Sequence, residues 1–170
     1  NVTAGGAVTN SGTLGIPGTA TISASSQAVT LNESSNNFGT AAITGANVAI
    51  TDTNAIILGA STVSGNYTVT AGGAITESGD LAINGRTTLV AGGNAITLDR
   101  AGNDFQAAVI ITSGGNVALR DTNAIELGAS AVTGTYTVTA GGAITNTGNL
   151  VITGVTTLVA GDNAITLSQS

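Results

Sequence analysis

The sequence predicts an all-β protein, a right-handed parallel β-helix, from its composition, its internal repeats and its strand spacing. Its 170 residues include 29 Thr, 25 Gly and 16 Asn, which are poor helix formers. Short runs of β-branched residues are separated by turn residues and return at intervals of about 20 residues. Hairpins do not account for this spacing, whereas a coiled chain pairs each strand in parallel with its counterpart one coil away.

The repeats are long and well preserved. Residues 47–98 align without a gap onto residues 116–167, at a shift of 69, with 39 of 52 positions identical. Residues 11–31 match residues 78–98 at a shift of 67. The chain therefore holds two and a half copies of one unit of roughly 67–69 residues, a period long enough to contain several coils of a solenoid.

A shorter pattern inside the unit defines the expected coils. A small or Gly residue, then Ala or Asn, then a β-branched pair recurs at sequence spacings of 20, 20, 27, 20, 22, 27 and 20. We therefore expect about seven coils, three per unit, each of ~20–27 residues as in other solenoids. A lateral excursion is expected in every third coil, at LGASTVSG (58–65) and LGASAVTG (127–134). The expected coils are residues 7–26, 27–46, 47–73, 74–93, 94–115, 116–142 and 143–162.

The chain begins and ends within a coil, and no capping segment is apparent at either end. Solenoids normally cap their terminal repeats. We therefore expect residues 1–170 to be a single β-helical segment, an excerpt of a longer array.

Each coil reads as three short strands, for example 74–76, 81–84 and 87–90. Strict alternation predicts that one set of side chains points inward: Ile75, Leu81, Ile83 and Leu89. The neighbouring set is expected to point outward: Thr76, Ala82, Thr88 and Val90. Segments 74–76, 94–98 and 116–120 should stack as parallel strands. The few aromatic residues recur at matching positions and are expected to fill the core: Phe38, Phe105, Tyr67 and Tyr136.

The composition excludes several functional classes. Without His and Cys the chain has no standard zinc site and no Ser–His or Cys–His nucleophile. A net charge of −6, with only three positively charged residues, argues against nucleic-acid binding. No apolar run approaches the ~20 residues of a membrane helix, so we expect no membrane insertion of this segment. We expect no cofactor and no metal.

Three sequence segments carry a resemblance to a known family. TTLVAGGNAITL (87–98), TTLVAGDNAITL (156–167) and YTVTAGGAIT (67–76 and 136–145) resemble the repeats of large bacterial filamentous-haemagglutinin-like adhesins. That resemblance covers essentially the whole chain. It implies a right-handed β-helical shaft, export by two-partner secretion, a location at the bacterial cell surface or in the biofilm matrix, and no catalytic residues.

Carboxylates are the only candidates for acid–base chemistry. Asp99 and Asp104 flank a loop, and Asp121 follows about one coil later beside Arg120. Asn32 and Asn37 occupy the positions of Asp99 and Asp104 one unit earlier, and Asp52 matches Asp121 within a repeated Asp-Thr-Asn turn. Residues that recur in this way are typical of turns closed by an Asx side chain. We therefore expect no catalytic residue and no enzyme.

A threonine stripe is the candidate contact surface. The third strand of each coil is expected to present outward threonines: Thr21, Thr44, Thr68, Thr70, Thr88, Thr112, Thr137, Thr139 and Thr157. Regular threonine ranks resemble those of ice-binding proteins, but Ala, Val and Ile interrupt this stripe, and Thr also suits any exposed strand.

The favoured function is structural: the shaft of an extracellular bacterial adhesin or biofilm-matrix protein that mediates attachment between cells or to surfaces. The partners expected for such a shaft are extracellular polysaccharide, a host or neighbouring cell surface, or other copies of the chain. Two alternatives remain, namely a β-helix that binds or degrades polysaccharide and an ice-binding β-helix.

Overall fold

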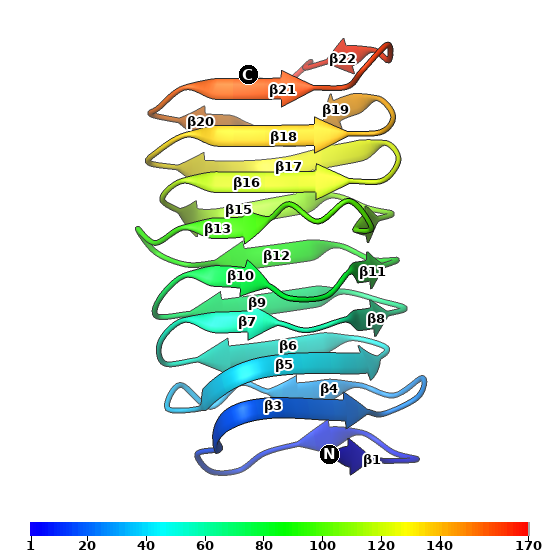
Figure 1. Cartoon of the computed structure of the whole chain (residues 1–170), viewed down its shortest axis with the longest axis vertical. Coiled ribbons are helices and arrows are strands. Elements are labelled where there is room, and N and C mark those ends of the chain that lie inside the picture. The colour runs from blue at the N-terminus through cyan, green and yellow to red at the C-terminus, as the bar shows by residue number, and fades with distance from the viewer. Residues whose placement is uncertain (170) are drawn as a thin grey trace.

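The chain forms a rod of stacked coils in a computed structural model that describes residues 1–169 (Figure 1). Its strands pair almost entirely with strands one turn earlier or later, and every pairing is parallel. In Figure 1 the front strands run from left to right and the back strands return from right to left, while the chain climbs from the N-terminus. This sense of coiling is right-handed, so the predicted right-handed parallel β-helix is confirmed.

Two sheets make up the walls, and we call them the front and back sheets after Figure 1. The front sheet has 12 strands within the described residues: β1 (Val2–Thr3), β3 (Gly15–Ser23), β5 (Asn37–Gly45), β7 (Ile56–Leu58), β8 (Ser61–Val63), β10 (Ile75–Glu77), β11 (Leu81–Ile83), β13 (Ile96–Leu98), β14 (Asp104–Phe105), β16 (Val117–Asp121), β18 (Tyr136–Ala140) and β21 (Thr156–Val159). The back sheet has 10: β2 (Val8–Thr9), β4 (Val29–Leu31), β6 (Val48–Asp52), β9 (Tyr67–Ala71), β12 (Thr87–Val90), β15 (Val109–Gly114), β17 (Ile125–Val132), β19 (Ile144–Asn146), β20 (Leu150–Ile152) and β22 (Ile165–Thr166).

The inward and outward positions follow the predicted alternation. Ile75, Leu81, Ile83 and Leu89 are fully buried, and the intervening side chains are half-buried or exposed. The predicted stack of three strands is also confirmed, because Ile75 on β10 pairs with Ile96 on β13, which pairs with Val117 on β16. A single apolar core therefore runs along the rod. It includes the four aromatic residues expected there: Phe38, Phe105, Tyr67 and Tyr136.

The coils are shorter and more uniform than the sequence spacing suggested. The sequence offset between paired residues on adjacent turns ranges from 17, for Thr40 and Ile57, to 23, for Val90 and Ser113. The rod has about eight turns rather than seven. The segment LGASTVSG (58–65) makes no lateral excursion, because its strand β8 pairs in register with β5 below and β11 above.

The repeat unit spans three and a half turns, not three. Val48 is on the back sheet, and three successive pairings lead from it to Tyr67, Thr87 and Val109. Val117, the counterpart of Val48 in the next unit, lies half a turn beyond Val109, on the front sheet.

Equivalent strands of consecutive units therefore lie on opposite faces of the rod. The longest sequence spacing, which is 27 both from Asn47 to Ala74 and from Asn116 to Ala143, marks the places where the pattern crosses from one sheet to the other. The expected boundaries at residues 47–73 and 116–142 thus each enclose more than one turn.

Candidate functional site

The predicted threonine stripe does not form one surface. Four of its members are on the back sheet: Thr68, Thr70, Thr88 and Thr112. The other five are on the front sheet: Thr21, Thr44, Thr137, Thr139 and Thr157. This division arises because each unit contains an additional half-turn. Equivalent strands of consecutive units therefore lie on opposite sheets.

Each sheet instead carries its own column of outward side chains, rich in threonine. On the front sheet successive pairings align Thr40, Ile57, Thr76, Thr97, Ala118, Thr137 and Thr157. On the back sheet they align Thr9, Thr30, Ala49, Thr68, Thr88 and Ile110. The predicted stripe left out Thr76 and Thr97 in the middle of the front column, although Thr76 was expected to point outward. The signal was present, because Thr76 and Thr97 each follow a buried isoleucine.

The two matching aspartates close turns inside the rod. Asp121 is 1% exposed, and its Oδ1 accepts a hydrogen bond from the amide of Asn123 at 2.8 Å. Its Oδ2 accepts a second bond from the amide of Phe105 at 2.9 Å, across a separation of 16 residues. Asp52, 2% exposed, accepts the equivalent bonds from Asn54 at 2.9 Å and Phe38 at 2.6 Å. The predicted Asx turns are therefore confirmed, and each carboxylate also ties its turn to a neighbouring turn.

Burial raises the pKa of Asp121 above its ordinary value. The amides of Asn123 and Phe105 partly offset this effect, and the nearby carboxylate of Asp104 adds to it. Both oxygens of Asp121 accept hydrogen bonds from backbone amides, and the side chain is closed off from solvent. A substrate therefore has no access to this carboxylate.

The remaining candidate residues are spread over the surface. Asp104 is half-buried, and its Oδ1 accepts hydrogen bonds from Gln106 at 2.6 Å and Asn123 at 2.9 Å. Asp99 is exposed at the other end of the loop. Arg120 adjoins Asp121 in sequence but is exposed, because successive side chains of a strand point to opposite faces. The structure thus brings Asp104 close to Asp121 but does not assemble the four residues into one site.

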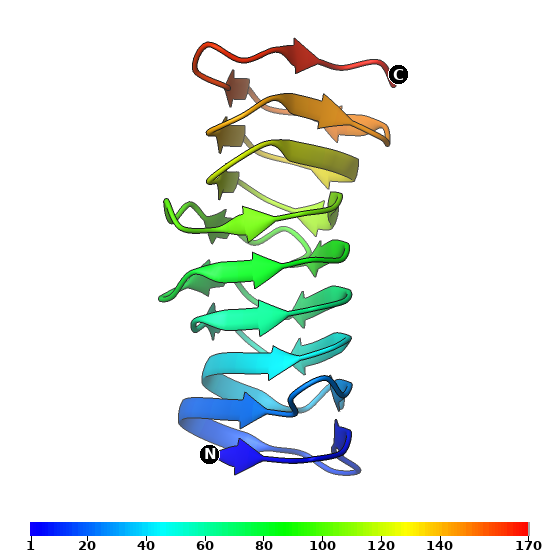
Figure 2. The same cartoon turned by 90° about the vertical axis from the view of Figure 1, so that its right-hand side faces the viewer.

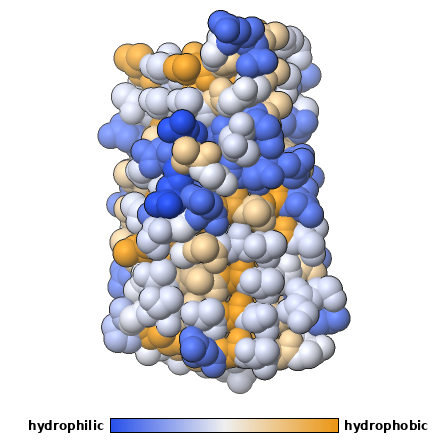
Figure 3. Space-filling view, turned by 45° about the vertical axis from the view of Figure 1, so that its right-hand side comes forward, coloured by the Kyte–Doolittle hydropathy of each residue, from blue (hydrophilic) through white to orange (hydrophobic). Residues whose placement is uncertain are grey.

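A polar cluster that sequence reasoning missed lies beside this loop. Glu77 Oε1 accepts hydrogen bonds from the amide of Arg100 at 2.7 Å and from Asn103 Nδ2 at 3.1 Å. The guanidinium of Arg100 donates to Asp80 at 2.7 Å, an exposed ion pair. Hydrophilic side chains gather about midway along the rod in Figure 3. Burial, chiefly, raises the pKa of Glu77.

The same cluster exists in neutral form one unit earlier. There Asn10 and Asn36 take the places of Glu77 and Asn103, and Asn10 Nδ2 donates to Asn36 Oδ1 at 2.9 Å. Asn36 and Asn103 are both fully buried, and their Oδ1 atoms accept bonds from the amides of Leu14 and Leu81, each at 2.9 Å. The shared role is to join adjacent turns. The sequence signal was the Asn at the same place before Phe38 and Phe105.

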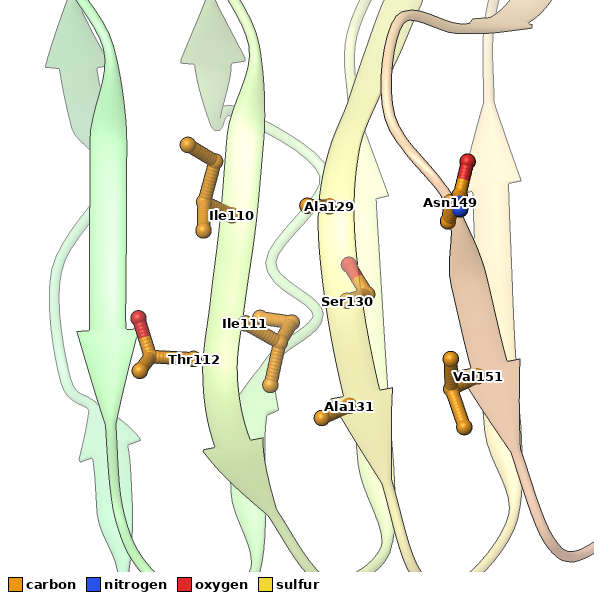
Figure 4. A pocket seen from close by; sticks show the side chains of 8 residues that line it. All are labelled: Ile110, Ile111, Thr112, Ala129, Ser130, Ala131, Asn149 and Val151. Carbon is orange, nitrogen blue, oxygen red and sulfur yellow. The ribbon is translucent and has the colours of Figure 1, made fainter. Parts of the chain in front are cut away.

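A shallow hollow of about 350 Å³ lies on the back sheet (Figure 4). Its floor is formed by Ala129 and Ala131 of β17, which are smaller than the side chains on the neighbouring strands. Those neighbours are Ile110 and Thr112 on one side and Asn149 and Val151 on the other. No ionisable group lines the hollow. It offers a small apolar surface and no acid–base chemistry.

Two buried phenols are further polar groups in the core. The hydroxyls of Tyr67 and Tyr136 lie near the buried hydroxyls of Ser61 and Ser130, but neither forms a hydrogen bond of standard geometry. Burial raises the pKa of Tyr67 strongly and that of Tyr136 to about 12, with the nearby serine lowering each slightly. Both phenols are therefore neutral at physiological pH and act as core residues.

Two further kinds of feature are absent from residues 1–169. That part of the chain contains no group of three or more acidic side chains arranged to hold a metal ion. It also contains no helix with the length and apolar character needed to cross a membrane.

Comparison with known proteins places the chain in a family. A family model described as "Repeats of unknown function (DUF5649)" matches residues 1–44, 45–112 and 114–170. No curated protein and no solved structure gave a significant match. Two of the matched segments begin at Gly45 and Gly114, the last residues of β5 and β15. The three matches cover nearly all 170 residues, and the chain therefore belongs to the DUF5649 family of repeats of unknown function.

Proposed function

We propose that this chain is part of the shaft of an extracellular bacterial adhesin or biofilm-matrix protein. The observation that carries the proposal is the use of its buried polar groups. Asp52 and Asp121 bond backbone amides of a neighbouring turn, and Asn36 and Asn103 do the same. Parallel ladders and a continuous aliphatic core join every turn to the next. Such a solenoid is a stiff spacer.

The resemblance of the repeats to filamentous-haemagglutinin-like adhesins supports the same proposal. In this view the protein is exported by two-partner secretion and works at the bacterial cell surface or in the biofilm matrix. The shaft holds a binding region away from the cell or bridges neighbouring cells. Its own contacts would be made through the threonine columns of the two faces, with extracellular polysaccharide or with a host or neighbouring cell surface.

Repeated weak contacts predict a dependence on array length. Equivalent surfaces recur in every unit, on alternating faces of the rod, so binding to cells or matrix polysaccharide should rise steeply between an array of two units and an array of six units. The length of the array should grow by three and a half turns per unit, which is about 17 Å at ~4.8 Å per strand. Electron microscopy of both arrays measures length and stiffness. Flexible or globular particles would contradict the proposal that the chain is a shaft.

The enzymatic alternative is tested separately. The chain should release neither reducing ends nor unsaturated products from a panel of neutral and acidic polysaccharides, because its buried acids bond backbone amides. Turnover by the unmodified chain that disappears in Asp99→Asn or Asp104→Asn, with the fold intact by circular dichroism, would contradict the shaft proposal and show that the chain is an enzyme. No observation favours ice binding, since Ile57 and Ala118 interrupt the front threonine column.

A further inference from the structure

The hollow on the back sheet is a place where the chain departs from its own repeat. It lies over β17, between β15 and β20, and its floor consists of Ala129 and Ala131. It opens on the long side of a straight stack of turns (Figure 2), so a further turn stacked on β20 would not cover it. The hollow is therefore a property of the side wall of the rod and not of either end.

The counterpart of this surface one unit earlier lies on the front sheet and has a different lining. Ala131 pairs with Val151 on the back sheet. Their counterparts Thr62 and Ala82 pair in the same way on the front sheet. The floor residue is thus smaller at the hollow than in the earlier unit, and the residue on the strand above it is larger. Both differences deepen the hollow.

The strand below the hollow differs in the same direction. A Cβ atom added to Gly128 would meet Ile110 of β15, whereas one added to its counterpart Gly59 would meet Ala42 of β5. A longer side chain therefore borders the hollow where the earlier unit has only a methyl group. The pairing of β15 with β17 also shifts register on both sides of Ile111, as at a β-bulge. Bulges redirect side chains and often lie beside binding sites.

The rim of the hollow is polar but uncharged. Thr112 and Asn149 are exposed on opposite sides of the floor (Figure 4). Asn149 stands where the earlier unit has Asp80, so an amide replaces a carboxylate at this rim. The eight lining residues include no ionisable side chain, and a charged group would therefore enter the hollow without an opposite charge. The ligand that fits is neutral, with a small apolar part flanked by polar groups.

We propose that this hollow binds one N-acetylated sugar residue of a neutral extracellular polysaccharide. The acetyl methyl group contacts Ala129 and Ala131, and the acetamide pairs with the side-chain amide of Asn149, which can both donate and accept hydrogen bonds. A volume of about 350 Å³ is at the lower end of the range for small-ligand sites and matches one sugar residue rather than several. The inference rests on the proposed function, because it names a partner that the shaft contacts outside the cell.

Titration followed by nuclear magnetic resonance tests the site in the purified 170-residue chain. An N-acetylglucosamine trimer (chitotriose) should shift the methyl signals of Ala129 and Ala131 and the side-chain amide signals of Asn149. A glucose trimer (cellotriose) carries hydroxyls in place of the acetamides and should shift these signals much less. Equal shifts with both trimers, or no shift with either, would overturn the proposal. Shifts that grow with protein concentration in the absence of sugar would contradict it by identifying a second copy as the occupant.

Two substitutions restore side chains of the earlier unit and are therefore compatible with this fold. Ala131→Thr fills the floor, and Asn149→Asp removes the amide, so each should weaken binding of chitotriose by about tenfold or more. Thr62→Ala, at the counterpart on the front sheet, is the control and should bind as the unmodified chain does. Unchanged binding in a folded Ala131→Thr variant, checked by circular dichroism, would place the sugar elsewhere. Rod length in electron microscopy does not depend on this binding, so the sugar site and the shaft can fail separately.

Discussion

Asp121 holds the amide of Phe105 at 2.9 Å, although 16 residues separate them along the chain. The bond joins the strand β14 to the end of β16, and Asp52 makes the same bond to Phe38 one unit earlier. Each aspartate is buried beside an aromatic residue that fills the core. This pair is therefore a fixed joint between neighbouring turns, and it recurs with the repeat.

Removing the carboxylate should destabilise this joint. Asp121→Ala leaves the amide of Phe105 without a partner in a buried site, which should cost about 1–3 kcal/mol, and it also removes the part-buried bond from the amide of Asn123. Urea unfolding followed by circular dichroism measures the loss. Asp99→Asn, at an exposed position, serves as the control and should change the free energy of unfolding by no more than about 0.5 kcal/mol. Equal effects of the two substitutions would contradict the assigned role.

Stability should increase, rather than decrease, as mild acid protonates Asp121 and Glu77. Burial raises the pKa of both carboxyls in the folded state, so the folded protein keeps these protons to higher pH than the unfolded chain does. The contribution of these groups to the free energy of unfolding is therefore greatest below their unfolded pKa values. It falls as the pH rises through the interval up to the folded pKa values. Thermal melting between about pH 4 and pH 7 measures this slope.

Glu77→Gln is the matched variant for the pH effect. Its amide oxygen can still accept the bonds from Arg100 and Asn103, and neutral Asn10 and Asn146 occupy the matching positions in the other units. The variant should melt at least as high as the unmodified chain at pH 7 and should show a smaller slope with pH. An unchanged slope in Glu77→Gln would exclude Glu77 as a source of the pH dependence.

The buried phenol hydroxyls make a third prediction possible. Tyr136→Phe removes a hydroxyl that has no hydrogen bond of standard geometry, so the free energy of unfolding should stay equal or rise. Tyr136→Ala removes the ring as well and should cost about 3–5 kcal/mol, the range for deleting a large aromatic side chain from a core. Chemical denaturation distinguishes the two. A large loss in Tyr136→Phe would mean that the hydroxyl has a partner in solution.

The alternation of single side chains could be read from the sequence, because strands place residues with a period of two. Ile75 and Leu89 point inward as that period requires. The half-turn of each unit could not be read, because Val48 on the back sheet and Val117 on the front sheet have the same inward role and the same neighbours in sequence. The sequence spacing gives the number of residues between strands, but it does not show which of the two sheets each strand joins.

The threonine stripe was divided for the same reason, since it took the third strand of each expected coil, and the expected coils at residues 47–73 and 116–142 each enclose more than one turn. The bond from Asp121 to Phe105 was missed because it joins residues on different turns. Its register is set by the pairing of whole strands. The Asx turn from Asp121 to Asn123 was predicted, because it is local.

Close approach of adjacent turns gives a fourth prediction. A Cβ atom added to Gly72 would collide with the backbone carbonyl oxygen of Thr53 on the turn below. Gly72→Ala should therefore force the two turns apart and cost about 1–3 kcal/mol, as overpacking typically does. Gly93→Ala is the control, because no atom lies within 4 Å of the position its Cβ would take. Midpoints of urea denaturation compare them, and a Gly72→Ala variant as stable as Gly93→Ala would contradict the register of these turns.

The last prediction concerns the two faces of one strand. Leu89 is fully buried between Val69 on the turn below and Ile111 on the turn above, whereas its neighbour Thr88 points outward. Leu89→Asp would place a carboxylate among aliphatic side chains that offer it no partner, at a cost of several kcal/mol. Thr88→Asp should change the stability much less, because its carboxylate reaches water. Circular dichroism should therefore show loss of the β signal for Leu89→Asp and its retention for Thr88→Asp.

Because the core is continuous from turn to turn, the Leu89→Asp defect should also spread beyond β12, and amide exchange should increase in the strands stacked on it, β9 and β15. Exchange confined to β12 alone would show that the turns of this rod are stabilised independently of one another.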